Sequence, residues 1–103
     1  MTATTPKPVT IDESRLDRLT AEQEQLFISR QTNSAMMHSR AVGSLAGGVT
    51  SSWQISVPQP IWISHGRGSH VWDVDGHEYV DFHGGYGVGL AGHAHPAIVA
   101  AVN

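Results

Sequence analysis

The chain has 103 residues, which is long enough for one small domain and too short for two. Its formal net charge of −3 offers no basic surface to nucleic acid or an anionic membrane, and the absence of cysteine excludes disulfides and thiolate metal sites. No run approaches the roughly 18 apolar residues of a membrane span. The first ten residues lack the apolar core of a secretory signal, so we expect a cytoplasmic protein.

The first part of the chain predicts a tail and then a long helix. Residues 1–11 are rich in threonine and proline and are predicted to be a disordered tail. Thr10 and Glu13 have the spacing of a capping box, and leucines 16, 19 and 26 share one face of the helix that follows. A second match at Thr20 and Gln23 allows a break there, but a single amphipathic helix that covers a partner surface is the preferred interpretation.

A shorter helix is expected next. Ser34 is predicted to cap a helix over residues 35–42 that Gly43 ends, so residues 12–43 form the N-terminal helices. Residues 44–60 then read as a loop, because glycine, serine and proline are frequent in them.

From residue 61 the hydrophobic period changes to two, which predicts a three-stranded antiparallel meander with strands at 61–64, 70–74 and 78–82. Asp75-Gly76 is a type I′ hairpin signal, and Asp73, Asp75 and Asp81 are expected to serve hairpin geometry and surface pairing. A glycine-rich loop at 84–89 follows. Pro96 suits the first position of a helix that reaches the end of the chain.

These elements look incomplete by themselves. The last helix has about two turns, and almost all of its residues are apolar. Helices shorter than roughly 12 residues are marginal in water. Three strands likewise need a surface to pack against. We therefore expect a fragment whose core lies elsewhere.

Several short motifs occur in a specific order in the second half: GRG at 66–68, WDVDG at 72–76, YVD at 79–81 and GHAHP at 92–96. In this order and spacing they resemble the start of class III aminotransferases, a fold-type-I family that depends on pyridoxal 5′-phosphate (PLP). The sequence GGV at 47–49 is most similar to the glutamate-1-semialdehyde aminomutase branch of that family.

The resemblance implies an α+β segment of N-terminal helices, a three-stranded meander and a helix, which forms part of an α/β homodimer. Residues 44–60 would line the active-site entrance, and residues 61–103 would give the small domain its meander, its glycine-rich loop and the start of a helix. The PLP domain would be missing from this chain. The partners would then be the remainder of the enzyme, a second identical subunit, and small amine or amino-acid and keto-acid substrates.

PLP chemistry needs a lysine amine that forms a Schiff base with the cofactor. The only lysine is Lys7, in the tail, where no apolar pocket lowers its pKa. The resemblance implies that the Schiff-base lysine lies beyond Asn103. We therefore expect no catalytic or cofactor-binding residue in this chain, PLP bound by the downstream region, and no activity from the 103 residues alone.

Three residues are candidates for substrate contact. Tyr86 lies in the glycine-rich loop where the aminomutase branch often has tryptophan near the substrate; the alternative is a packing aromatic. Ser51 and Gln54 follow GGV, and Gln54 stands where that branch often has an arginine that faces the substrate carboxylate. The absence of that arginine favours transamination over aminomutase activity, although Gln54 is equally well explained as a solvated loop residue.

Two other kinds of site are disfavoured. Residues 84–89 do not have the G-x-G-x-x-G spacing of a phosphate cradle, and we expect a conformationally permissive loop instead. His93 and His95 alone make a weak metal motif, and a turn that caps the Pro96 helix or pairs across subunits is the preferred interpretation. Three hypotheses remain: an aminotransferase segment, a standalone interaction module or gene remnant that binds through its apolar meander, and a small histidine-based metal binder.

Overall fold

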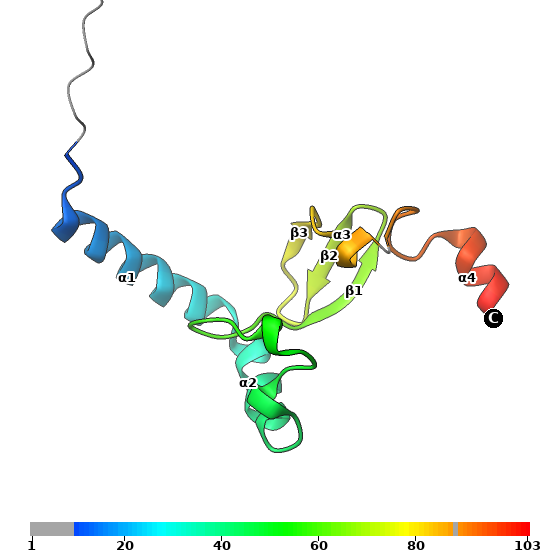
Figure 1. The fold of residues 1–103 in the computed structure, drawn as a ribbon, viewed down its shortest axis with the longest axis horizontal. Coiled ribbons are helices and arrows are strands. Elements are labelled where there is room, and N and C mark those ends of the chain that lie inside the picture. The colour runs from blue at the N-terminus through cyan, green and yellow to red at the C-terminus, as the bar shows by residue number, and fades with distance from the viewer. Residues whose placement is uncertain (1–9, 88) are drawn as a thin grey trace, which may run out of the picture.

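The structure is a computed structural model that describes residues 10–87 and 89–103. The predicted tail therefore lies almost wholly outside the described residues, and so does Lys7. A bent pair of helices lies at one end of the molecule, a three-stranded sheet in the middle and a short helix at the other end (Figure 1).

Helix α1 (Glu13–Arg30) starts at a different cap from the one predicted. The carboxylate of Asp12 accepts a hydrogen bond from the backbone N–H of Arg15 at 3.1 Å, so Asp12 is the N-cap and the predicted capping box at Thr10 is wrong. The helix runs through Thr20 without interruption, which confirms a single long helix. None of its residues is buried within this chain.

Helix α2 (Thr32–Val42) begins three residues earlier than predicted. Gln31 takes the N-cap position with φ −115° and ψ 43°, and it is also the residue at which the chain bends after α1. Ser34 lies inside the helix and is completely buried, so the prediction that it caps the helix is wrong. Gly43 follows the helix as predicted, but with φ −70° rather than the left-handed conformation.

The meander is confirmed. Strand β1 (Ile63–Arg67) pairs antiparallel with β2 (His70–Asp73), and β2 pairs antiparallel with β3 (Glu78–Val80). β1 begins and ends later than predicted, because Gly66 and Arg67 continue the ladder opposite Val71 and His70. The register of β1 shifts between Ile63 and His65, which marks a bulge.

The loop between β2 and β3 is not the predicted type I′ turn. That turn needs positive φ at both central residues, and Gly76 (φ 87°) has it whereas Asp75 does not. The side chain of Asp73 organises the loop instead. Its Oδ1 accepts hydrogen bonds from the backbone N–H groups of Asp75 at 2.9 Å and His77 at 2.8 Å.

The second carboxylate oxygen of Asp73 joins the sheet to the bend between the helices. Oδ2 accepts hydrogen bonds from the Tyr79 hydroxyl at 2.7 Å and from Gln31 Nε2 at 3.1 Å, and it lies 3.1 Å from His77 Nδ1. Asp73 is only 2% exposed, so the prediction of surface pairing is wrong for this residue. Burial raises the pKa of Asp73, but the hydrogen bonds from Tyr79, His77 and Gln31 outweigh it and hold the pKa well below its usual range.

The side chains of Asp75 and Ser34 add further hydrogen bonds between the hairpin and α2. The carboxylate of Asp75 accepts hydrogen bonds from the backbone N–H groups of Asn33 at 2.6 Å and Ser34 at 2.9 Å, which are unpaired donors in the first turn of α2. The Ser34 hydroxyl donates to Gln31 Oε1 and accepts from the N–H of Trp62, both at 3.2 Å. The Asp75 carboxylate of the hairpin thus caps the N-terminus of α2, and Ser34 of α2 holds Trp62, the residue just before β1.

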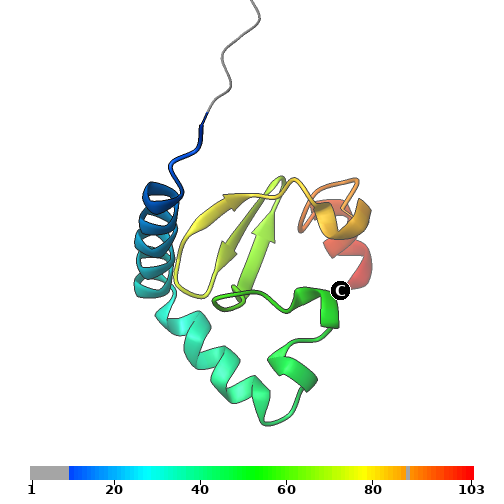
Figure 2. The same cartoon turned by 60° about the vertical axis from the view of Figure 1, so that its left-hand side comes forward.

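Apolar packing within the chain is sparse. Among the described residues the buried apolar side chains are those of Ala41, Val49 and Pro60, while large apolar side chains along α1, α4 (Pro96–Val102) and the loops are exposed. The radius of gyration is 19.8 Å, against about 13 Å for a compact domain of roughly 100 residues. The sheet separates the helical pair from helix α4 in both views, so α1 and α4 do not cover each other (Figures 1 and 2).

The remaining elements are short. Two 3₁₀ turns, Ala46–Gly48 and Ser52–Gln54, interrupt the loop after α2. Helix α4 (Pro96–Val102) has proline in its first turn, as predicted. In the described ranges no helix combines the length and apolar character that crossing a membrane requires.

We expect Asp73→Ala to lower the free energy of unfolding of the intact natural protein by about 3 kcal/mol, because buried donors on Tyr79 and Gln31 would lose their acceptor. Urea denaturation measures this change. Asp17→Asn, on the exposed surface of α1, is the matched control and should shift stability by less than about 0.5 kcal/mol. Equal effects of the two substitutions would contradict the role of the buried carboxylate.

The same carboxylate predicts sensitivity to acid. The folded-state pKa of Asp73 lies below its ordinary value of 3.8, so its stabilising contribution is complete above that value and is lost as the pH falls toward the folded-state pKa. The urea midpoint of the intact protein should therefore fall as the pH is lowered below about 4. Asp73→Asn, which removes the titrating group, should show a shallower decline; an unchanged slope would rule out this source of acid sensitivity.

Candidate functional site

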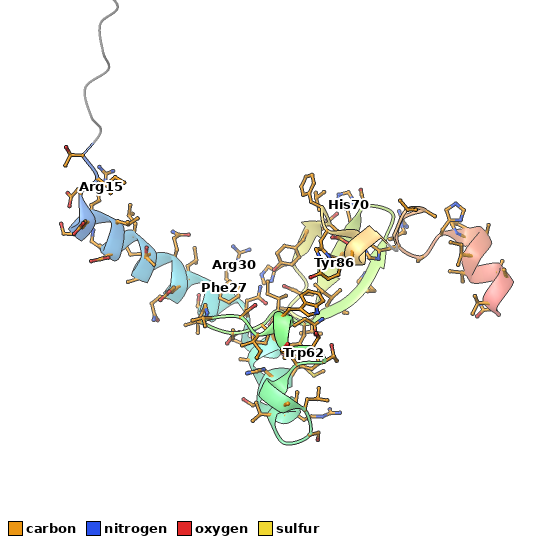
Figure 3. The ribbon with its side chains drawn as sticks, viewed as in Figure 1. Arg15, Phe27, Arg30, Trp62, His70 and Tyr86 are labelled. Atoms are coloured by element: carbon orange, nitrogen blue, oxygen red, sulfur yellow. The ribbon has the colours of Figure 1, made fainter. Side chains whose placement is uncertain are left out.

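An open groove of about 1220 Å³ lies between α1 and the chain that leads into β1. One wall comes from α1, with Leu19 and Phe27 among its side chains, and the other comes from residues 49–63. Figure 3 labels Phe27 and Trp62, which come from the opposite walls. The indole Nε1 of Trp62 is buried and has no hydrogen-bond partner within the described part of the chain. The lining of the groove is mainly apolar, and the N–H group of Trp62 is an unsatisfied hydrogen-bond donor beside it.

Gln54 lines this groove, as a substrate-contacting residue would. Its amide oxygen is used within its own loop, where it accepts hydrogen bonds from the Thr50 hydroxyl and from the backbone N–H of Ser51, the latter at 3.1 Å. Ser51 is thus next to Gln54 but is not among the residues that line the groove. The loop fixes the glutamine side chain, and it does not provide the double donor that an arginine would offer to a carboxylate.

Tyr86 lies in a left-handed turn. Gly84, Gly85, Tyr86 and Gly87 have φ values of 56°, 59°, 62° and 89°. Glycine adopts this conformation without penalty, whereas a tyrosine in it is strained, by about 1–3 kcal/mol. The prediction of a conformationally permissive loop is confirmed for these described residues. The strain falls on the one large side chain of the turn, which is also 71% exposed.

The tyrosine ring belongs to a small aromatic cluster that sequence reasoning missed. Its ring centroid lies 4.3 Å from that of His83 and 4.9 Å from that of Trp53, with both pairs edge to face, and Trp53 stacks on His83 at 5.9 Å. Trp53 and His83 both line the groove. The cluster therefore brings Tyr86 to the end of the same groove that Gln54 lines. A tryptophan inside a serine-rich loop was the available sequence signal for Trp53.

Asp81 holds the beginning of the glycine-rich turn. Its Oδ1 accepts hydrogen bonds from the backbone N–H groups of Gly84 at 2.9 Å and His83 at 2.8 Å, and its Oδ2 lies 2.6 Å from His93 Nε2. The Gly84 N–H, His93 and the His83 N–H together lower the pKa of Asp81 to about 2. A carboxylate that stays ionised is a constant acceptor for the turn that carries Tyr86.

The residues of this site do not themselves fit a PLP cofactor. The described part of the chain contains no lysine, and the segment around the glycine-rich turn, residues 81–95, has neither lysine nor arginine to pair with a phosphate. Nor do three or more His, Asp or Glu side chains converge on a metal position among the described residues, so the histidine-based metal site gains no support. His95 is the N-cap residue of α4, as the preferred interpretation of the histidine pair has it, but its side chain makes no capping hydrogen bond; pairing across subunits stays a prediction.

Comparisons with known proteins agree on one family. The family described as aminotransferase class-III matches residues 52–103. Glutamate-1-semialdehyde 2,1-aminomutase of Symbiobacterium thermophilum is 38% identical over 72% of this chain and 18% of that protein. The 2-aminoadipate transaminase of Pseudomonas putida is 51% identical over 50% of this chain and 12% of that protein.

The fold gives the same result. The β-phenylalanine aminotransferase of Variovorax paradoxus superimposes with a TM-score of 0.78 at 31% identity, over 84% of this chain and 20% of that one. The chain thus spans about a fifth of the length of the relatives it matches. The predicted order of helices, meander and helix is confirmed as a segment of the fold-type-I transaminase architecture. The chain belongs to the class III aminotransferase family.

Proposed function

We propose that this chain is the N-terminal part of a PLP-dependent aminotransferase that moves an amino group between an amine or amino acid and a keto or aldehyde acceptor. The observation that carries the proposal is Tyr86, held in a strained backbone conformation against Trp53 and His83 at the end of an apolar groove. Strain of this kind persists where the surroundings enforce it, and it concentrates at functional sites.

In this proposal residues 44–60 and the turn around Tyr86 form part of the substrate entrance. Gln54 contributes a polar group, which the backbone N–H of Ser51 helps to hold, and Trp53 and Tyr86 contribute aromatic surface for the apolar part of an amine. PLP, which supplies the electron sink for transamination, would be bound by a region outside this chain. The replacement of an arginine by Gln54 favours transamination over the aminomutase reaction.

The exposed apolar side chains support a place within a larger assembly. Leu16, Leu19 and Leu26 of α1 are 43–53% exposed, and Val102 at the end of α4 is 80% exposed. We propose that the remainder of the enzyme and a second identical subunit cover these surfaces. A cytoplasmic location stays a prediction.

The alternative is a standalone interaction module that binds a partner through its apolar surfaces and has no catalytic role. The same exposed side chains would serve that function. The strained Tyr86 and its aromatic neighbours favour the enzyme segment, because a docking surface has no need of a strained tyrosine.

The intact natural protein is expected to absorb visible light as PLP enzymes do and to transfer an amino group from a small amine to a keto acid. The 103-residue chain alone should do neither. Absence of both properties from the intact protein would overturn the proposed function and leave the interaction module. Gel filtration of the 103-residue chain, with circular dichroism, then shows whether a folded monomer exists.

Tyr86→Ala in the intact protein should raise KM for the amino donor about tenfold, which corresponds to roughly 1.4 kcal/mol of lost contact, with a smaller change in kcat. Tyr86→Phe retains the ring and is the matched control, so its KM should stay close to that of the natural protein. Steady-state kinetics with two donors that differ in the size of their apolar group measure the effect. If Tyr86→Ala has the KM of the natural protein for both donors, Tyr86 does not contact substrate.

A further inference from the structure

His93 is fixed against the turn between β1 and β2, although it lies more than 20 residues away in the chain. Its backbone forms a two-way bridge with Gly68: the His93 N–H donates to the Gly68 carbonyl at 2.8 Å, and the Gly68 N–H donates to the His93 carbonyl at 2.9 Å. Its ring lies against Gly66, where an added Cβ would come within 2.7 Å of His93 Cγ. The absence of a side chain at Gly66 therefore makes room for the imidazole.

The imidazole of His93, which follows the glycine-rich segment in the chain, also contacts Asp81, which precedes that segment. Asp81 Oδ2 lies 2.6 Å from His93 Nε2, while Asp81 Oδ1 accepts the two backbone N–H groups that open the left-handed turn. Because an ionised carboxylate only accepts hydrogen bonds, Nε2 of His93 carries the hydrogen. One carboxylate thus ties the start of the segment to the histidine that follows its end.

Tyr86 lies between these two fixed points. The segment closes on itself through a hydrogen bond from the Gly89 N–H to the Gly84 carbonyl at 3.0 Å. Glycines have many backbone conformations available, so a glycine-rich segment holds one of them only when its ends are held. The ring contacts of Tyr86 with Trp53 and His83 depend on that conformation.

We propose that Asp81 and His93 form a clamp that positions Tyr86 at the substrate entrance, so that His93 is a positioning residue that sets which amino donors are accepted. The clamp acts through Tyr86 and does not touch the substrate. This inference rests on the substrate role proposed above for Tyr86.

A double-mutant cycle in the intact enzyme tests the clamp. His93→Ala should raise KM for the donor about five- to tenfold while kcat changes by less than about twofold, because the reacting atoms are not touched. In a Tyr86→Ala background the same substitution should have no further effect on KM. His93→Gln, which can keep a nitrogen donor near the position of Nε2, should restore most of the lost affinity.

Two further variants keep the test informative. His95→Ala is the matched control: it lies in the same motif, is exposed and makes no side-chain cap to α4, so KM should not change. Asp81→Asn preserves the shape of the clamp but weakens its bond to His93, and it replaces His93→Ala if that variant does not fold; its KM should rise in the same direction.

The outcomes separate the clamp from the proposed function. An altered KM in Tyr86→Ala with an unaltered KM in His93→Ala and Asp81→Asn would overturn the clamp and leave the substrate role of Tyr86 intact. Additive effects of His93→Ala and Tyr86→Ala on KM would also overturn it, because His93 would then act independently of Tyr86. If Tyr86→Ala itself has the same KM for the donor as the natural protein, the substrate role of Tyr86, on which the clamp depends, is refuted.

Discussion

The buried carboxylate of Asp73 is the constraint on which the arrangement of this chain depends. A buried charge costs several kcal/mol unless hydrogen bonds compensate it, and here donors from the hairpin loop, from Tyr79 and from Gln31 supply them. The most distant of these donors, Gln31, is 42 residues from Asp73 in the chain. Gln31 Nε2 would lose this acceptor if the helices and the sheet separated, so the network fixes the bend at Gln31 against the meander.

A small apolar core makes this network more important than it would be in a compact domain. Hydrophobic contact is non-directional, and the buried apolar side chains in the described part of the chain are those of Ala41, Val49 and Pro60. Hydrogen bonds to a carboxylate depend on distance and angle. The orientation of the helices relative to the sheet is therefore specified by polar contacts, with Asp75 adding a second one at the first turn of α2.

The sequence supported those parts of the fold that depend on neighbouring residues. The meander and the helix at Pro96 follow from alternation and from the fixed φ of proline, and both are confirmed. The cap at Thr10, the cap at Ser34 and the surface role of Asp73 were wrong for two reasons. In the last two cases a distant segment provides the hydrogen-bond partner, and in the first a nearer carboxylate at Asp12 competes for the helix end.

The same limit applies to the candidate site. Tyr86 and Gln54 could be chosen from the resemblance to a family, because the motifs place them along the chain. Trp53 could not, since its contact with Tyr86 arises only when the loop after α2 folds back beside the glycine-rich turn. His83 lies three residues before Tyr86, but no motif distinguished it from the other histidines. Exposure of a tryptophan in a serine-rich loop indicates that it lacks a core partner, but it does not say which residue it meets.

The four motifs of the sequence signature thus have two separate physical roles. WDVDG joins the sheet to the helices through its two carboxylates, and GRG, YVD and GHAHP meet where His93 lies between Gly66 and Asp81. Polar groups are satisfied at both places, whereas the apolar side chains of α1 and α4 remain exposed. Directional bonds within the chain therefore set the position of Tyr86 and Gln54, and apolar burial within the chain contributes little to holding them. A chain built in this way can hold the geometry of a turn and a loop without having a substantial core of its own.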